Sequence, residues 1–178
     1  MRFKVRGVDF WGRFVVWGNL PADEGYYIRL FVSQWKAENF LPKLATLREG
    51  DLIEMTGYCD LAKYENLWNT PSLSLGIADA SFTKLLPNGK PAPAPQRIPV
   101  NLISAVYGSG TAFADVTDRV KALLAEPGAR FYANPNWLGA DPTPGWNKAL
   151  IIVHQVGTKR QTFTVGENSE VNAALIVK

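Results

Sequence analysis

The residues of this chain that are best suited to chemistry lie in residues 26–32, where aromatic and basic residues alternate with aliphatic ones. Side chains of an extended strand alternate between its two faces, so Tyr27, Arg29 and Phe31 are expected on one face. Two aromatic rings that flank a guanidinium can stack on flat rings and pair with phosphate groups. A second reading buries Phe31 beneath a neighbouring helix. The opposite, aliphatic face is expected to belong to a core.

Other aromatic and basic residues are expected near this surface. Trp68 lies between asparagines and a proline in residues 60–71, which we predict to be a long hairpin loop. Basic residues of the first strand and of the loops could neutralise phosphates, although such charges are often only solvated. Trp17 and Trp35 are ambiguous, because a tryptophan in a strand can equally be a core residue. The further candidates are Lys4, Arg6, Trp11, Arg13, Lys63 and Trp68.

Five strands and one helix must position these residues. Strict alternation of polar and apolar residues predicts the first strand over residues 2–8. A helix is predicted over residues 38–48, because four apolar residues of this stretch share one helical face and Gly50 follows as a stop signal. The remaining strands are expected at residues 14–17, 26–32, 52–61 and 73–77.

A helix between the third and fourth of five strands is the arrangement of the OB fold, a partly open five-stranded β-barrel. The local sequence is more specific, with Y-I-R-L-F-V at 27–32, L-R-E-G-D at 47–51 and I-E-M-T-G-Y at 53–58. These motifs resemble the OB domain of bacterial and phage single-stranded DNA-binding proteins over residues 26–85. The predicted fold class is therefore mainly β: a five-stranded OB-fold barrel with one helix, followed by a second small β-rich domain with one helix.

The resemblance implies sequence-independent binding and protection of single-stranded DNA during replication, recombination or repair. It also implies that Tyr27 and Tyr64 stack on bases, because both fall where the family carries stacking aromatics. A homo-oligomer is expected from the family, with the first strand and its neighbours as a subunit interface. The chain closes with A-L-I-V-K where the family has a flexible, acidic-tipped tail. We therefore do not expect it to recruit the family's usual replication partners.

The chain is expected to contain two domains. Residues 1–86 form the OB-fold domain, residues 87–97 form a stiff linker with four prolines, and residues 98–178 form the second domain. A helix over residues 116–125 and a last strand over residues 171–177 are predicted there. This half resembles a small accessory β-module attached to varied bacterial proteins, which implies attachment or interaction with a protein partner. Trp137 and Trp146 could form that partner surface or could anchor a loop.

An enzymatic function finds little support, and we expect no catalytic residue, metal or cofactor. His154 is the single histidine, inside an apolar strand where a hydrogen-bonded structural role is expected, and Cys59 is the single cysteine. The G-S-G run at 108–110 lacks the residues that complete a P-loop or a dinucleotide fingerprint. Asp115 and Asp118 are better explained as charges at a helix N-terminus.

The composition of the chain limits the kinds of partner and of location that are expected. The chain has 178 residues, 47% of them hydrophobic, and a net charge of +3, which permits a polyanionic partner but is not a polybasic composition. No apolar stretch reaches the roughly 20 residues of a membrane helix, so we expect a cytoplasmic protein, or one of the host cytoplasm if phage-encoded.

RNA and oligosaccharides remain alternative ligands of the predicted OB-fold domain. The alternative from another class is an OB-fold interaction or structural module of a larger assembly that binds no nucleic acid.

Overall fold

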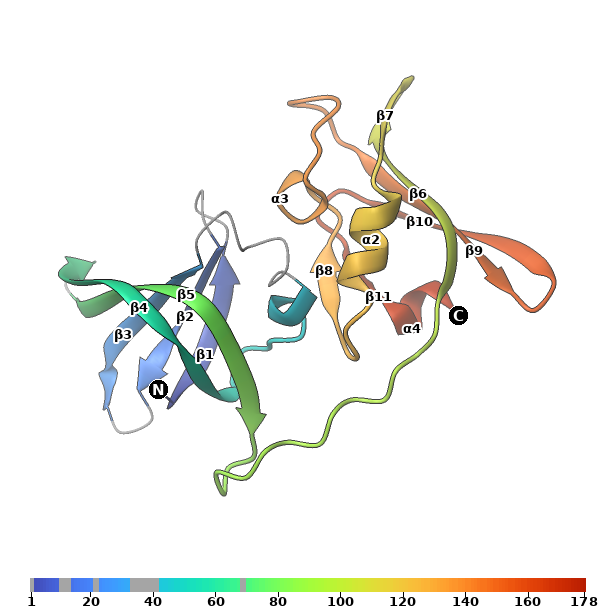
Figure 1. Ribbon diagram of the computed structural model, residues 1–178. Coiled ribbons are helices and arrows are strands. Elements are labelled where there is room, and N and C mark those ends of the chain that lie inside the picture. Colours follow the sequence, from blue (N-terminus) through green and yellow to red (C-terminus); the bar gives the residue numbers. More distant parts are fainter. Residues whose placement is uncertain (1, 10–13, 21–22, 33–41, 68–69) are drawn as a thin grey trace. The chain divides into compact units, whose positions relative to one another are not determined.

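The computed structural model divides the chain into two compact units, residues 1–94 and residues 95–178 (Figure 1). It describes residues 2–9, 14–20, 23–32, 42–67 and 70–178. Strands make up most of the regular structure in both units. The prediction of a mainly β protein is therefore confirmed. No helix within these ranges is long and apolar enough to cross a membrane.

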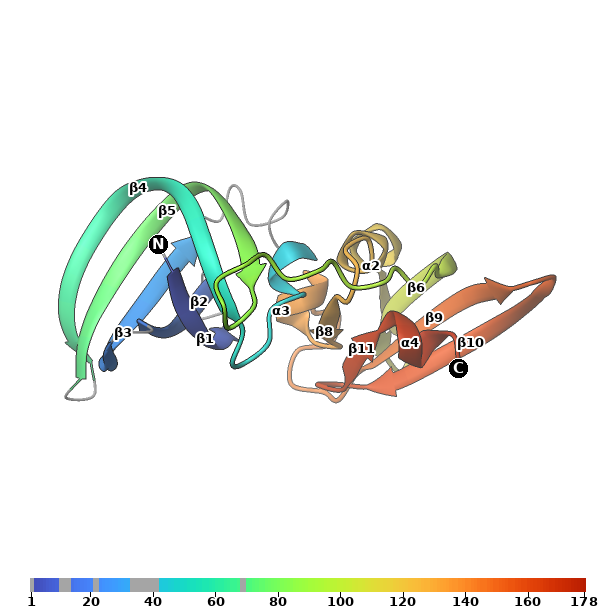
Figure 2. The same ribbon diagram turned by 90° about the horizontal axis from the view of Figure 1, so that it is seen from below.

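Unit 1, residues 1–94, is built from five strands, and those over residues 14–20 and 23–32 are rich in β-branched and aromatic residues, which favour extended backbone. Their bounds are β1 Arg2–Asp9, β2 Phe14–Leu20, β3 Asp23–Val32, β4 Leu52–Leu67 and β5 Thr70–Leu85. The strand order is β1-β2-β3-β5-β4, and the start of β4 pairs in turn with β1. β3 and β5 are parallel, whereas the other pairs are antiparallel. Figure 2 shows β4 and β5 as a long, curved pair.

The interior of unit 1 combines strand residues with the end of the predicted helix. Val5 and Ile53 are fully buried, and Leu44 and Leu47 pack into the same unit with exposures of 1% and 4%. Residues 42–44 are helical and lead into a turn, so the helix ends before the predicted residue 48. The predicted first turn, residues 38–41, lies outside the described residues. The spacing of Leu44 and Leu47 identified the buried side of this segment correctly.

The predicted loop over residues 60–71 is wrong, because both strands of this hairpin continue through it. The β4–β5 ladder runs without interruption from Leu61 opposite Gly76 to Leu67 opposite Thr70. Polar residues such as Lys63 led to the loop prediction, yet they occupy regular strand positions. Two register shifts lie just before this stretch, between Thr56 and Tyr58 and between Cys59 and Leu61. Such irregularities bend a strand locally.

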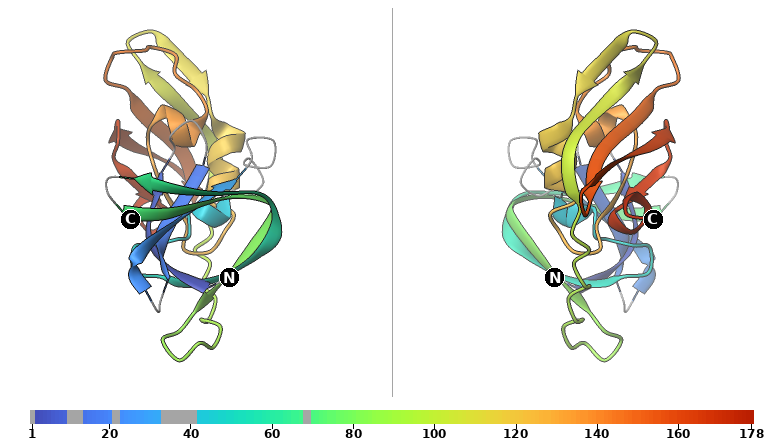
Figure 3. Two further views of the ribbon diagram at one scale, coloured as in Figure 1. Left: turned by 90° about the vertical axis from the view of Figure 1, so that its left-hand side faces the viewer. Right: turned by 90° about the vertical axis from the view of Figure 1, so that its right-hand side faces the viewer.

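The predicted linker, residues 87–97, is extended only in its later part. Its beginning folds back on β5: the Leu86 N–H donates to the Lys90 carbonyl at 2.7 Å, and the Ala92 N–H donates to the Lys84 carbonyl at 2.8 Å. This turn is the light green loop at the lower end of both views in Figure 3. Residues 93–100 have no regular secondary structure. The proline-rich segment is therefore partly an extension of unit 1.

Unit 2, residues 95–178, contains a four-stranded antiparallel sheet in the order β10-β9-β6-β7 and a two-stranded sheet of β8 and β11. The strands are β6 Asn101–Ser109, β7 Ala112–Asp115, β8 Arg130–Tyr132, β9 Ala149–Val156, β10 Lys159–Gly166 and β11 Glu170–Asn172. The helices are α2 Thr117–Leu123, α3 Pro135–Leu138 and α4 Ala173–Ile176.

The core of unit 2 lies against one face of its larger sheet. On β9, Leu150, Ile152 and His154 are buried, while the residues between them are partly exposed. The buried positions on α2 are Val120 and Leu123, both with no exposed surface. Alternation with period two on the strands and buried residues three apart on the helix explain why these segments pack together.

Two short helices of unit 2 were not predicted, and the expected single helix is therefore wrong. Asn134 begins α3 by accepting a hydrogen bond from the backbone N–H of Trp137 at 3.2 Å, and Pro135 follows at the first helical position. Asn172 begins α4 in the same way, accepting from the Leu175 N–H at 3.0 Å. The predicted strand over residues 171–177 accordingly ends at Asn172.

Gly108 and Gly166 provide a matched test of packing in the larger sheet, because both pair with Ala149, from opposite sides. A Cβ at Gly108 would overlap the Ala112 carbonyl oxygen and lie 2.8 Å from the Cα of Phe113, whereas nothing lies within 4 Å of one at Gly166. We expect Gly108→Ala to lower the free energy of unfolding by about 1–3 kcal/mol. Gly166→Ala should leave it unchanged or slightly raised, because glycine in a strand is entropically costly. Denaturant unfolding followed by circular dichroism measures both, and equal losses would contradict the argument.

Candidate nucleic-acid interface

The predicted binding residues of β3 lie at alternate positions, so Tyr27, Arg29 and Phe31 share one face of the sheet. Because β3 is paired on both sides, each of them belongs to a row of directly opposite residues that crosses the sheet. Residues directly opposite one another in a sheet lie on the same face and are close neighbours. The strand register therefore shows which predicted residues are brought together.

The tyrosine row combines a predicted aromatic with a predicted basic residue. Tyr27 pairs with Asn19 on β2 and with Ser72 on β5. Asn19 in turn pairs with Lys4 on β1. Lys4 is exposed, so this row lies on the outer face of unit 1 at that point. Lys4 and Tyr27 are thus placed on one surface, although they are far apart in sequence.

The arginine row lies two residues further along β3. Arg29 pairs with Trp17 on β2 and with Ser74 on β5, and Ser74 pairs with Lys63 on β4. Two predicted basic residues are therefore separated only by the width of β5, roughly 10 Å from strand to strand. Trp17 is a residue that the sequence left ambiguous. Its position beside Arg29 adds it to the candidate surface, and only the β2–β3 register could have shown this.

The third row is apolar. Phe31 pairs with Val15 on β2 and with Gly76 on β5. No basic residue is brought next to Phe31 among its direct partners in the described strands. The candidate surface therefore has its charged residues in the tyrosine and arginine rows.

The rows between these three belong to the interior. Ile28 pairs with Gly18 on β2 and with Leu73 on β5, and Gly18 pairs with Val5, which is fully buried. In the next interior row, Leu75 is 7% exposed. This agrees with the predicted assignment of the aliphatic residues of β3 to the core.

Tyr64 and Arg6 depart from the expected surface. Tyr64 pairs with Leu73, so it lies in the row of Val5 and on the face opposite to Tyr27. Arg6 is half-buried at the register shift between Val5 and Gly7, between the tyrosine and arginine rows. The register therefore does not bring the two tyrosines together.

Three further predicted residues, Trp11, Arg13 and Trp68, lie outside the described residues.

Within the arginine row, Ser74 is only 4% exposed, so the middle of that row is covered.

Two other basic residues of unit 1 are engaged with carboxylates. The Arg2 guanidinium lies 2.8 Å from Glu54, and the Lys84 ammonium lies 2.7 Å from Asp51. Lys84 also donates to the Thr46 carbonyl. These ion pairs fasten β1 to β4 and β5 to the turn before β4. We therefore do not add Arg2 and Lys84 to the candidate surface.

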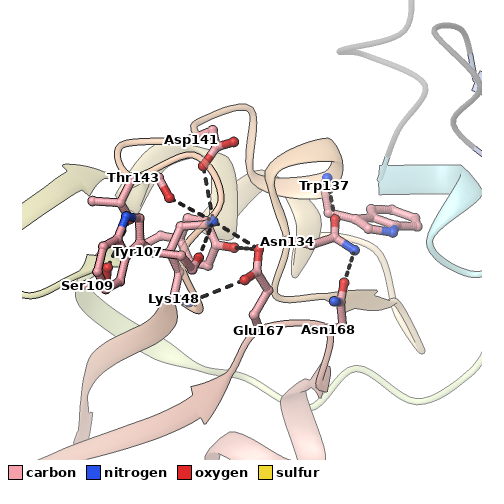
Figure 4. A network of polar contacts seen from close by, with 10 residues as sticks. Tyr107, Ser109, Asn134, Trp137, Asp141, Thr143, Lys148, Glu167 and Asn168 are labelled. Carbon is pink, nitrogen blue, oxygen red and sulfur yellow. Dashed lines mark hydrogen bonds and ion pairs between the residues drawn. The ribbon is translucent and has the colours of Figure 1, made fainter.

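A separate polar cluster in unit 2 surrounds Lys148, whose side chain is 3% exposed (Figure 4). Its Nζ lies 3.1 Å from Glu167 Oε1 and 3.2 Å from Asp141 Oδ1. It also donates to the backbone carbonyls of Trp146 at 2.8 Å and Thr143 at 3.3 Å. A buried ammonium is thereby fully partnered, and it ties the Pro/Gly-rich loop of residues 139–147 to the end of β10.

The protonation states of this cluster are held by its contacts. Burial raises the pKa of Tyr107, and so does the hydrogen bond that its hydroxyl donates to Glu167 at 2.9 Å. Burial acts to raise the pKa of Glu167, but hydrogen bonds from Lys148 and Tyr107 outweigh it, so this pKa is lowered. Burial acts to lower the pKa of Lys148, but Glu167 and Asp141 outweigh it, so this pKa is raised. Lys148 and Glu167 therefore stay charged through the neutral range.

The two tryptophans considered for a partner surface have different environments. Trp137 is 5% exposed, and its carbonyl accepts a hydrogen bond from Arg119 at 2.8 Å, so it belongs to the core of unit 2. Trp146 is 73% exposed on the loop that Lys148 holds. Only Trp146 remains available as a contact residue.

His154 is buried without the hydrogen bond that a structural histidine was expected to make. It is 2% exposed, between Leu102 on β6 and Gln161 on β10, and within the described part of the chain neither ring nitrogen has a partner. The expectation of a hydrogen-bonded strand histidine is therefore wrong. A buried, unpaired imidazole is costly to stability.

In the described ranges, no three His, Cys, Asp or Glu side chains are grouped so that they could hold a metal ion. Asp115 lies just before α2, and its pKa is lowered by hydrogen bonds from Thr117, first from the Thr117 side chain and then from the Thr117 N–H at 2.8 Å. No protein-family model, curated protein or solved structure matches the chain.

The Glu167 contacts predict a loss of stability in acid. Because the pKa of Glu167 is lowered in the folded state, its contribution is present above the unfolded value near 4.5 and is lost as the pH falls through the folded value. We expect the melting temperature of unit 2 to fall more steeply below about pH 4.5 in the native chain than in Glu167→Gln, which lacks this titration. Scanning calorimetry from pH 3 to pH 7 measures this, with Glu170→Gln, in a half-exposed ion pair with Arg130, as the control. Equal acid slopes for the native chain and Glu167→Gln would contradict the assignment.

The unpaired imidazole predicts that His154→Leu stabilises unit 2. The substitution removes two buried polar atoms without hydrogen bonds and keeps most of the volume, so the free energy of unfolding should rise by about 1 kcal/mol. Chemical denaturation at pH 7 measures the change. His154→Asn, which keeps buried polar atoms and reduces the volume, is the control and should be destabilising. A loss of stability in His154→Leu would indicate that the ring makes a contact that stabilises the fold.

Proposed function

We propose that unit 1 is an OB-type barrel that binds single-stranded DNA without sequence preference, as a binding protein with no catalytic activity of its own. The observation that carries the proposal is the strand register, which assembles Lys4, Tyr27, Arg29 and Lys63 from three strands into two neighbouring rows. The function would be protection of exposed strands in replication, recombination or repair. Its place would be the cytoplasm, or the host cytoplasm if the chain is phage-encoded.

The strand pairing supports the OB assignment. The order β1-β2-β3-β5-β4, the parallel β3–β5 pair and the return of β4 to β1 are the pairings expected of a five-stranded Greek-key barrel of this type. The helical residues 42–44 lie between the third and fourth strands, as in the predicted arrangement. Barrels of this kind bind oligonucleotides on an exposed strand face.

The residue types of the two rows suit a single strand better than a duplex. Aromatic rings stack only on bases that are not already stacked in a helix, and each stacked base contributes about 1–3 kcal/mol. Lys4, Arg29 and Lys63 would follow the phosphates, and successive rows lie about 7 Å apart along the strands. Together these residues do not form an array that could read base edges, so no sequence preference is expected.

One observation favours the alternative of an interaction module. Ser74, in the middle of the arginine row, is buried, so this part of the surface is not freely open. A chain that keeps this row covered would bind neither DNA nor RNA and would use its surfaces for protein partners. Titration with single-stranded oligonucleotides separates the two functions.

Titration of the intrinsic tryptophan fluorescence with oligo-dT, an rU oligomer and duplex DNA of equal length, at two salt concentrations, tests the proposal. We expect saturable quenching by oligo-dT, weakening by about 0.7 log units per log unit of salt for each phosphate contacted, and little effect of the duplex. Stronger binding of the rU oligomer would redirect the proposal to RNA. No quenching by either single strand at low salt would favour the interaction module.

Variants of the two rows locate the surface. Tyr27→Ala should weaken oligo-dT binding by about 1–3 kcal/mol, or roughly 5- to 150-fold. Arg29→Ala should weaken it and lower the salt slope by about 0.7. Tyr132→Ala and Lys121→Ala remove exposed residues of the same types from unit 2 and serve as controls. If the controls and the row variants lose affinity equally, the surface has been misplaced.

A further inference from the structure

The second half of β4 is a sheet edge. β4 pairs with β5 from Leu52 to Leu67, but it pairs with β1 only from Leu52 to Glu54. In the described part of the chain, residues 61–67 therefore have a hydrogen-bonded neighbour strand on one side only. The unpaired backbone groups of such an edge can accept another strand.

This edge has a regular geometry. Both register shifts of the β4–β5 ladder lie before Leu61, and every residue from Leu61 to Leu67 has one opposite partner on β5. A β-bulge is one device that prevents an edge from pairing with another chain. No register shift interrupts residues 61–67, and Ala62 is exposed to solvent.

The sequence of the edge, L-A-K-Y-E-N-L at residues 61–67, is self-complementary about its centre. If two copies pair antiparallel with Tyr64 on the two-fold axis, Lys63 of each copy lies opposite Glu65 of the other. Leu61 likewise lies opposite Leu67 of the other copy. Opposite charges and apolar pairs at directly opposite positions stabilise a ladder, whereas like charges destabilise it. A shift of the register by two residues would place like charges or unlike residues opposite one another.

We propose that the edge of β4 at residues 61–67 binds a second copy of this chain, in an antiparallel two-fold pair centred on Tyr64. The same segment contacts itself across the axis, as closed dimers require. The hairpins of the two copies form one continuous sheet. The inference does not depend on nucleic-acid binding, because it rests on the free edge and on its charge pattern.

Charge exchange tests the pairing in the full chain without nucleic acid. The dissociation constant of the native dimer is measured by sedimentation equilibrium. Lys63→Glu places Glu opposite Glu65 of the second copy, and Glu65→Lys places Lys opposite Lys63, twice in each dimer. Each single variant should raise the dissociation constant about tenfold. The double variant, Lys63→Glu with Glu65→Lys, restores opposite charges and should return it to within about twofold of the native value.

Two control variants make the same charge changes away from the edge. Lys43→Glu and Glu49→Lys alter exposed residues outside β4 and should leave the dissociation constant unchanged. Far-ultraviolet circular dichroism shows whether each variant is folded. A native chain that is monomeric at every concentration, or single variants without effect, would overturn the proposal. So would a double variant that remains as weak as the single ones.

Disulfide formation gives a second readout that does not depend on charge. In a Cys59→Ser background, Tyr64→Cys places two cysteines opposite each other on the axis, with their Cα atoms about 4.5–5.5 Å apart, within reach of a disulfide. Ala62→Cys is the matched control, because its two copies would be separated by roughly 14 Å along the strand. Oxidation should cross-link the first variant and not the second. Equal cross-linking of both, or none in the first, would overturn the proposed register.

Discussion

The pairing of β3 on both of its edges is the constraint on which the rest of unit 1 depends. β2 lies antiparallel on one side and β5 lies parallel on the other, so the backbone groups of β3 are satisfied in one register. A shift of one residue would exchange its two faces and would bring Arg29 to the position of Ile28. The buried Val5 and Leu75 in the aliphatic rows stabilise the observed register. The candidate surface exists because the interior fixes this register from the other side of the sheet.

Unit 2 is organised around a buried charge. Lys148 holds a loop whose glycine and proline content gives it few backbone hydrogen bonds of its own, and it does so through two carboxylates and two carbonyls. Such an arrangement is expensive to desolvate and tolerates the loss of a partner poorly. The exposed Trp146 is carried on this loop, so its position depends on contacts beneath it. The unpaired His154, in contrast, is a polar residue that the core tolerates.

Much of the fold could be predicted from local patterns, and the parts that were missed involve pairing between distant residues. Alternation in residues 2–8 and 26–32 predicted strands and their two faces, because a side-chain period of two is a local property. Lys63 was placed in a loop because polar composition resembles a turn, whereas its strand position depends on Ser74 across the ladder. The N-terminal caps Asn134 and Asn172 are local signals that were overlooked. No local signal predicts that the ring nitrogens of His154 lack hydrogen bonds, because the apolar residues next to it in sequence are typical of any buried strand.

The same register matters for folding. The partner of Arg29 on β5, Ser74, lies far along the chain, and the pairing of Arg2 with Glu54 is equally distant. Contacts between such remote residues require a large loop to close, and they slow folding in comparison with local hairpins. During synthesis, β1, β2 and β3 leave the ribosome before β5 has been made. The edge of β3 that pairs with β5 is therefore unpaired until β5 has been synthesised. The arginine row therefore forms only when β5 docks and completes the sheet, and no shorter nascent chain contains the assembled surface.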